Sequence, residues 1–393
     1  MSMPAANPPS KRKKIILAAL TSLVGILVIG GVAFAGYTLY RQTQSEKNQL
    51  AQQLADTKAE LEALKTQDPH KTNEELKVKI RESERVYLSA VAAYEKLLDA
   101  KATLKNTTQL DALFANALTL LAKLDYEGAT KKIAELNSEI TTQTTKVAAA
   151  TTPVPNAPVS NTPPGSGYSR QNVNSDAGTF TVSIISADLG STRVIVDTAS
   201  TSDCSNDCPV LPLATYVSRS GAFAGVNGTY FCPADYPSCA GKTNTFDLLV
   251  MNKDKYYFNS GNNVYSNNPA AIFSPGSARF VGAASEWGRD TGVDAVISNY
   301  PLLVSGGNVA FGGDDDPKKG SKGSRSFIGT NGSTVYIGVV HNATVAESAR
   351  VLKAMGLQNA LNLDNGGSTA LWSGGYKVGP GRNLPNVVLF VRR

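Results

Sequence analysis

The distribution of apolar and polar residues divides the chain into four stretches. Residues 15–40 are apolar and carry no charge, and residues 41–148 show helical periodicity. Residues 149–176 are rich in Pro, Thr and Ser, and residues 177–393 hold short apolar runs between Gly, Asn, Asp and Pro. This pattern predicts an apolar helix, a helical stem, a linker and a strand-rich domain, in that order.

The apolar stretch at 15–40 is long enough to cross a bilayer as a helix. Basic residues at 11–14 precede it, and Tyr37 and Tyr40 lie at its far end. Basic flanks stay on the cytoplasmic side. The alternative is a cleaved signal peptide, but no small-residue cleavage pattern ends the stretch. We expect a single-pass signal anchor in the cell membrane, with residues 1–14 cytoplasmic and the C-terminal domain extracytoplasmic.

Apolar residues recur at helical spacing through the stem, residues 41–148. The first run steps by four and three residues, as in the seam of a coiled coil, and Asp68-Pro69 ends it. Three further runs follow, at 76–98, 110–121 and 133–140. Between the last two, Leu124–Ala129 resembles the turn of a tetratricopeptide-like hairpin. Two interpretations stay open: a spacer that lifts the next domain off the membrane, or an interaction module, either a dimerising coiled coil or a partner-binding helical module. The first run suggests a homodimer.

The linker and the charge distribution limit the possible partners. Alternation of Pro with Thr, Ser, Asn, Ala and Gly at 149–176 predicts an extended, mobile segment. The chain has 38 basic and 32 acidic residues, a net charge of +6, and the basic tail carries most of the excess. No broad basic surface is left for a phosphate backbone, which argues against nucleic-acid binding.

The C-terminal stretch, residues 177–393, is long enough to bury its own core. Five strands stand out, at 180–185, 193–196, 295–297, 335–340 and 387–391. One helix is expected at about 345–355, because Thr344 and Glu347 form a capping box before it and Gly356 stops it. The prediction is an α+β fold with more strand than helix, preceded by a transmembrane helix and an α-helical, partly coiled-coil stem.

Four cysteines occur, Cys204, Cys208, Cys232 and Cys239. All follow the predicted membrane segment, which places them in an oxidising compartment. Local disulfides, Cys204–Cys208 and Cys232–Cys239, are the simplest pairing, although sequence does not fix connectivity. A four-cysteine zinc site is the alternative, but these spacings are loose for zinc.

The strongest candidate for chemistry lies at 361–371. Leu361 and Leu363 predict a strand that delivers Asp364 and Asn365 into two glycines, Gly366 and Gly367, and two hydroxyls, Ser368 and Thr369. Adjacent glycines permit a sharp turn and a close approach. A carboxylate at the end of a strand, in such a loop, is typical of a site. The simpler alternative is a hairpin turn.

Other short elements offer further candidate residues. Asn227-Gly228 follows a small apolar run. This pair is either a plain hairpin turn or a site where the Asn227 amide holds a sugar or phosphate oxygen. Arg325, between two serines, can grip an anion, and Arg382 before the last strand is a second such candidate. His341 ends a predicted strand and is either an acid or base or a structural histidine. A proline-started strand, 301–307, runs into a glycine turn.

Several other kinds of site are weak or missing. Asp314-Asp315-Asp316 is a carboxylate run that suits calcium, but nearby lysines favour a solvated loop. Gly-x-Ser-x-Gly and His-Glu-x-x-His elements are missing from the sequence, which argues against a peptidase or nuclease.

Taken together and in order, these elements resemble the phosphodiester glycosidase family. The resemblance runs over about 180–393 and is most specific at 362–371, where the family usually has Leu-Asp-Gly-Gly-Gly-Ser. This chain has Asn365 in place of the first of those glycines. It also has Thr229 where a second glycine is frequent, and Ser326 where threonine usually follows the arginine.

The resemblance implies hydrolysis of a sugar-1-phosphodiester, here in cell-envelope or exopolysaccharide glycans. It implies catalytic roles for Asp364, Arg325 and Asn227. Substrate contacts would come from Gly366, Gly367, Ser368, Thr369, Asn365, His341 and Arg382. No cofactor or metal is expected, although the sequence leaves a divalent cation open. The alternative function is a non-catalytic glycan-binding surface protein on the same fold.

Overall fold

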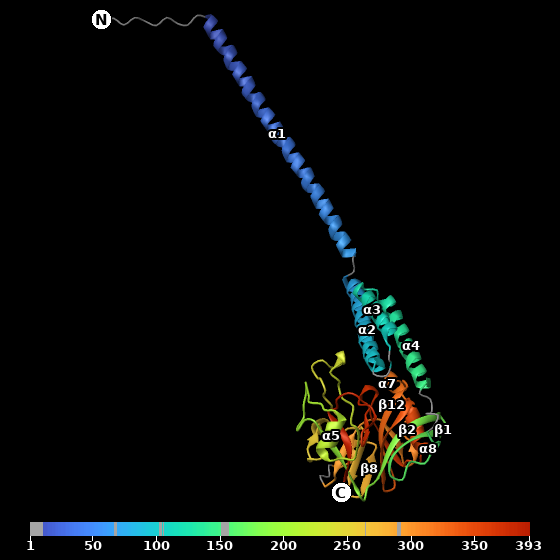
Figure 1. Ribbon diagram of the computed structural model, residues 1–393. Helices are drawn as coiled ribbons and strands as arrows, with labels where there is room; N and C mark the ends of the chain where they lie inside the picture. Colours follow the sequence, from blue (N-terminus) through green and yellow to red (C-terminus); the bar gives the residue numbers. More distant parts are fainter. Residues whose placement is uncertain are drawn as a thin grey trace, which may run out of the picture. The chain divides into compact units, whose positions relative to one another are not determined.

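The computed structural model describes residues 11–66, 69–101, 104, 106–150, 157–263, 265–288 and 292–393 (Figure 1). Most of the predicted basic tail, residues 1–10, lies outside this set. The chain divides into two compact units, residues 1–81 and residues 82–393.

The first unit consists of helix α1 (Lys11–Thr66) and the beginning of helix α2 (Pro69–Lys101). Pro69 is the first residue of α2, a position where its missing N–H group costs nothing. The predicted break at Asp68-Pro69 is therefore confirmed. None of the described helices is long and apolar enough to cross a membrane. The predicted anchor at 15–40 falls within α1, where most side chains up to residue 35 lie outside the described set.

The second unit begins with a small helical bundle. The C-terminal part of α2 packs with α3 (Thr108–Ala122) and α4 (Tyr126–Ala150) around a core of buried Leu, Ala, Ile and Val side chains. The predicted turn between α3 and α4 is present, with Leu124 at a φ of 60° and Asp125 accepting the Gly128 N–H at 2.9 Å. The later helical runs of the sequence thus contribute to a packed bundle, whereas the first run lies in α1.

Three antiparallel sheets build the rest of this unit. The first has the strand order β1-β2-β13-β12-β14-β10-β11. Its bounds are β1 (Gly167–Ser175), β2 (Gly178–Asp188), β10 (Leu302–Ser305), β11 (Asn308–Val309), β12 (Gly323–Asn331), β13 (Thr334–Ala343) and β14 (Asn359–Asn365). The second has the order β16-β15-β4-β17-β3. Its bounds are β3 (Thr192–Thr198), β4 (Ala224–Asn227), β15 (Leu371–Ser373), β16 (Tyr376–Val378) and β17 (Asn386–Arg392).

The third sheet has the order β6-β5-β9-β7-β8. Its bounds are β5 (Val250–Met251), β6 (Tyr257–Phe258), β7 (Ala270–Ser274), β8 (Ser277–Val281) and β9 (Ala295–Ser298). The short helices are α5 (Leu213–Ser220), α6 (Ser260–Asn263), α7 (Pro317–Gly320), α8 (Val345–Ala354) and the 3₁₀ turns η1 (Pro237–Cys239), η2 (Ala284–Glu286) and η3 (Gly366–Ser368). The five predicted strands fall within β2, β3, β9, β13 and β17, so the strand-rich α+β prediction holds for this unit.

One apolar core joins the three sheets. Ile337 of the first sheet, Val388 of the second and Phe273 of the third are completely buried within it. A second apolar cluster packs helix α8 onto the other face of the first sheet, around Phe327 and Leu352. Helix α8 begins with the predicted capping box, in which Thr344 and Glu347 bond each other's backbone N–H groups at 3.1 and 2.7 Å. This packing fixes the strand that leads to Asp364.

The predicted linker extends too far toward the C-terminus. Residues 167–175 form β1, a full edge strand paired with β2, and the described chain is already tied to it from residue 157. The Gln171 amide, which is buried, donates to the carbonyls of Ser160 and Thr162 at 2.7 and 2.9 Å. Hydropathy missed this strand because its inward side chains are mostly polar and are satisfied by backbone groups.

Both predicted disulfides are present. Cys204 pairs with Cys208 and Cys232 with Cys239, and no free cysteine is left among the described residues. The zinc alternative is therefore excluded, because the thiolates it requires are consumed.

Candidate active site

A pocket of about 940 Å³ opens where strands β4 and β14 end and β12 begins. Its walls include Asp364, Arg325, Tyr230, Ser368 and Arg382. A volume of this size suits a small ligand or one unit of a polymer. Residues that lie more than a hundred positions apart in the sequence therefore meet around one cavity.

The backbone of Asp364 is clamped from both sides. Its N–H donates to the Gly228 carbonyl at 2.9 Å, and its own carbonyl accepts the Asn227 side-chain amide at 2.7 Å. A side chain at Gly228 would overlap Asn386, so only glycine permits the close approach of Asn386 to this turn. The Asn227-Gly228 pair and the Asp364 loop thus form one rigid unit.

The carboxylate of Asp364 lies buried at the base of the pocket. It accepts the Asn365 backbone N–H at 2.8 Å and a hydrogen bond from the Ser368 side chain. Burial raises its pKa to about 7, while those two hydrogen bonds and the charge of Arg382 oppose the rise. A carboxyl group that titrates near neutrality can exchange protons at physiological pH.

The glycine turn positions part of the predicted binding set. Gly366 has a φ of 62° and begins the 3₁₀ turn that the Thr369 N–H closes at 3.1 Å. Gly366, Ser368 and Asn365 line the pocket. Gly367 instead lies against the guanidinium of Arg382, where a side chain would clash. The Thr369 hydroxyl points to the Ser324 carbonyl at 3.4 Å.

Arg325 is brought to the pocket by irregular strand pairing. The register of β12 shifts on both sides of it, against β13 and against β14, and such bulges re-aim a side chain. The residue is only 5% exposed, and its guanidinium donates to the carbonyls of Ala343 and Lys318 at 2.9 and 3.1 Å and to that of Ser321. Burial lowers the pKa of Arg325. Within the described residues, no carboxylate forms an ion pair with it. Arg325 is thus a buried cation without a direct counter-ion.

Asn227 does not line the pocket as the expected substrate contact. Its side chain is completely buried, and its oxygen accepts the Ser326 hydroxyl at 2.8 Å and the Ala370 N–H at 3.1 Å. Its amide nitrogen donates to the Asp364 carbonyl. All of these partners are protein atoms, so the structure gives Asn227 a supporting position behind the Asp364 loop.

The helical bundle contributes a wall to the same pocket. Asp99 of α2 accepts the Tyr236 hydroxyl at 2.6 Å and pairs with Arg382 at 3.1 Å. Arg382 also pairs with Asp235 at 3.2 Å, and these carboxylates raise its pKa against the opposing effect of burial. The predicted second anion clamp is therefore already occupied by carboxylates. The stem is more than a spacer, because its side chains reach the site.

His341 lies at the pocket edge and pairs with Ser183. Its Nε2 is 2.9 Å from the Ser183 hydroxyl. Burial, with a smaller effect from the charge of Arg170, lowers its pKa to about 4. The imidazole is therefore neutral at pH 7, which weakens a role as general acid.

We expect the His341 ring to stay neutral from pH 8 down to about pH 5. Its folded pKa lies below the ordinary value near 6.5, so folding stability is fully present above pH 6.5 and falls as pH drops toward 4. Histidine-selective NMR titration checks this, with His341→Gln assigning the signal. A midpoint near 6.5 would contradict the buried environment.

Two pocket features escaped the sequence interpretation. The hydroxyl of Tyr230 contacts the amides of Asn362 and Asn365, and Asp99 arrives from the distant helix α2. Tyr230 lies three residues after Asn227, so its proximity to that motif was a usable signal. No sequence signal pointed to Asp99, because an acidic residue at its place in a helical run is predicted to be exposed to solvent.

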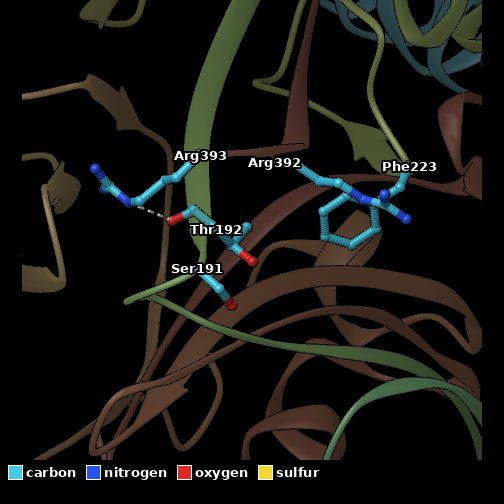
Figure 2. Close-up of a pocket in the computed structure, with 5 residues that line it drawn as sticks. All are labelled: Ser191, Thr192, Phe223, Arg392 and Arg393. Atoms are coloured by element: carbon cyan, nitrogen blue, oxygen red, sulfur yellow. Dashed lines mark hydrogen bonds between the residues drawn. The ribbon is translucent and has the colours of Figure 1, made fainter.

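The acidic run lines the pocket, and a second hollow lies elsewhere in the domain. Asp314 pairs with Lys319, and Asp316 caps α7 by accepting the Lys318 N–H at 2.8 Å. Among the described residues, no group of His, Cys, Asp or Glu is arranged to hold a metal ion. A smaller hollow of about 450 Å³ lies at the end of β17, where Arg393 donates to the Thr192 carbonyl at 3.2 Å (Figure 2).

Comparison with known proteins confirms the family resemblance. The model of the phosphodiester glycosidase family matches residues 220–391, a range that contains Asn227, Arg325, Asp364 and Arg382. Curated protein sequences gave no match. The family match supports a hydrolase that acts on phosphodiester-linked glycans.

Solved structures show more distant similarity. The catalytic domain of zebrafish N-acetylglucosamine-1-phosphodiester alpha-N-acetylglucosaminidase, auto-inhibited by its pro-peptide, matches with 15% identity and a TM-score of 0.46, over 60% of this chain and 87% of that one. A hypothetical protein from Synechocystis matches with 15% identity and a TM-score of 0.40, over 57% of this chain. The present chain spans 62% of the Synechocystis protein. These similarities are too weak to carry functional detail.

Proposed function

We propose that the C-terminal domain hydrolyses sugar-1-phosphodiesters at the bond between the anomeric carbon and the phosphate oxygen. Water gives its hydroxyl to the anomeric carbon, and its proton ends on the released phosphomonoester. The observation that carries this proposal is that Asp364 and Arg325 line the same pocket, and that Arg325 is buried without a direct counter-ion. A phosphodiester anion supplies the charge that Arg325 lacks, and it places a phosphate leaving group near the carboxylate.

Asp364 acts in its ionised form as the base that takes the proton of the attacking water. Its pKa of about 7 makes the ionised form available at neutral pH. Hydrogen bonds from Asn365 and Ser368 hold the carboxylate in place. Ordinary glycosidases need a second carboxyl group as acid. A phosphate leaves as a stable anion, so that second group is dispensable here.

The cell compartment is the second part of the proposal. Two disulfides support an oxidising, extracytoplasmic location, and the apolar stretch at 15–40 would anchor the chain to the cell membrane. In that setting the natural substrates are phosphodiester-linked glycans of the cell envelope or exopolysaccharide. Side chains of α2 and α4 close one side of the pocket.

The test is hydrolysis by the full chain of methyl phosphodiesters of glucose, mannose and N-acetylglucosamine, each linked through the anomeric carbon. We expect free sugar and methyl phosphate as products. In isotopically labelled water the heavy oxygen should enter the sugar. Label in the phosphate would show a phosphodiesterase instead. Absence of turnover with every sugar, combined with saturable glycan binding, would favour the glycan-binding alternative.

A further inference from the structure

Tyr230 presents its hydroxyl at the wall of the pocket. The residue follows β4, and its backbone N–H donates to the Asn299 side chain at 3.0 Å. Its ring lies 5.1 Å from the ring of Tyr300, at an interplanar angle of 58°. These contacts fix the ring, so the hydroxyl occupies a defined position beside Asp364 and Arg325, the two charged groups that act on it most strongly.

Two side-chain amides donate to the Tyr230 oxygen. The Asn362 nitrogen lies at 2.6 Å and the Asn365 nitrogen at 3.3 Å. The orientation of both amides is fixed by other partners. The Asn365 oxygen accepts the Ser326 backbone N–H at 3.0 Å, and the Asn362 nitrogen also donates to the Tyr300 carbonyl at 3.0 Å. Flipping either amide would set like groups against each other, so nitrogen must face the phenol.

The hydroxyl proton of Tyr230 is therefore left for a ligand. A phenol oxygen that receives two N–H donors has used its acceptor capacity, and its own O–H must point elsewhere. Over the part of the chain that the structure describes, the Tyr230 hydroxyl accepts these two hydrogen bonds and donates none to a protein acceptor. Tyr230 is half-buried and lines the pocket, so the acceptor for this proton comes from the pocket itself, either solvent or a bound ligand.

We propose that Tyr230 donates a hydrogen bond to a phosphate oxygen of the bound substrate, and that Asn362 and Asn365 orient it for this task. This inference rests on the proposed hydrolysis. Negative charge grows on the phosphate as the anomeric bond breaks, so a preorganised donor stabilises the transition state. Burial and the charge of Asp364 raise the pKa of Tyr230, so the phenol stays protonated and donates a hydrogen bond rather than a proton.

Tyr230→Phe removes only the hydroxyl, and we expect kcat to fall about 10²-fold, the usual effect of losing one such donor. The matched control is Tyr300→Phe, in the neighbouring ring, whose hydroxyl receives no amide donor within the described residues. That control should keep the wild-type kcat. Equal rates for Tyr230→Phe and the wild type would overturn the proposal.

The positioning role of Asn365 needs a double mutant. Asn365→Ala should lower kcat in the wild type but cause no further loss in the Tyr230→Phe background, because both changes remove the same interaction. Additive losses would show that Asn365 acts independently of Tyr230, and would overturn the positioning part.

Binding separates this inference from the proposed reaction. Titration calorimetry with glucose 1-phosphate should show weaker binding to Tyr230→Phe than to the wild type and to Tyr300→Phe. If the wild type binds this probe in the expected way but hydrolyses no diester, the reaction is wrong and the Tyr230 contact stands. If the wild type binds no glucose 1-phosphate, or if all three proteins bind it equally, the contact is wrong.

Discussion

Asp364→Asn is expected to lower kcat by about 10²–10⁴-fold, the usual contribution of a general base. Asparagine fills the same space and still accepts the Asn365 N–H, so the loop should stay folded. The amide cannot take a proton from water. Steady-state hydrolysis of the best sugar-1-phosphodiester measures the loss, and Asp315→Asn, another acid of the same pocket, is the control.

The same carboxyl group predicts the shape of the pH profile. Because the ionised form acts and the pKa of Asp364 is about 7, kcat/KM should rise as pH increases through 7 and level off above it. A rate that falls across pH 7 would show that the protonated form acts, and the role of base would be wrong.

Asp364 also has a cost for stability. The pKa of Asp364 in the folded state is raised above the unfolded value near 3.9. The protonated carboxyl group is therefore favoured by folding, and the stability that this gives is fully present below about pH 4 and is lost as pH rises through 7. A pKa raised by about three corresponds to a loss of about 4 kcal/mol in the free energy of unfolding between low and high pH. Asp364→Asn should therefore melt at a higher temperature than the wild type at pH 8. Equal melting temperatures at pH 8 would mean that the buried charge is well compensated.

The conformation of the Asp364 loop was predictable from sequence because its signals are local. A strand, a carboxylate and two glycines stand next to each other at Leu363–Gly367, and the helix before them has an explicit cap. Disulfide pairing was predictable for the same reason, since each bridge joins nearby residues. These features depend on local backbone conformation and on contacts between residues that are close in sequence, and both can be predicted from a short stretch of the chain.

Other features depend on distant partners and could not be predicted. Arg325 and Arg382 look equivalent in sequence, yet carboxylates from Asp99 and Asp235 neutralise only Arg382. Strand β1 was missed because burial of Gln171 becomes favourable only once the preceding segment supplies carbonyl acceptors. Asn365 replaces a glycine expected in the family, and its side chain bonds Tyr230 and Ser326.

The difference between the two arginines gives the second large prediction. Arg325→Met should lower kcat/KM by about 10³-fold, since it removes a buried cation that binds the phosphate in the ground state and stabilises its growing charge in the transition state. Arg382→Met should cost much less, because its guanidinium is already paired with two carboxylates. The two variants carry the same substitution, and the charge that is removed is unpaired at Arg325 and paired at Arg382.

Loss of Arg325 also removes donors from backbone carbonyls, so stability must be measured together with activity. The carbonyl of buried Ala343 would lose its Arg325 donor, at about 1–3 kcal/mol if it is left unsatisfied, whereas the Lys318 carbonyl keeps the Ser321 hydroxyl at 3.0 Å. A second readout separates anion binding from folding. Inorganic phosphate should raise the melting temperature of the wild type and of Arg382→Met but not that of Arg325→Met. Arg325 has no counter-ion of its own, so a phosphate that enters the pocket should bind to it. Equal stabilisation of all three proteins by phosphate would show that the anion binds elsewhere.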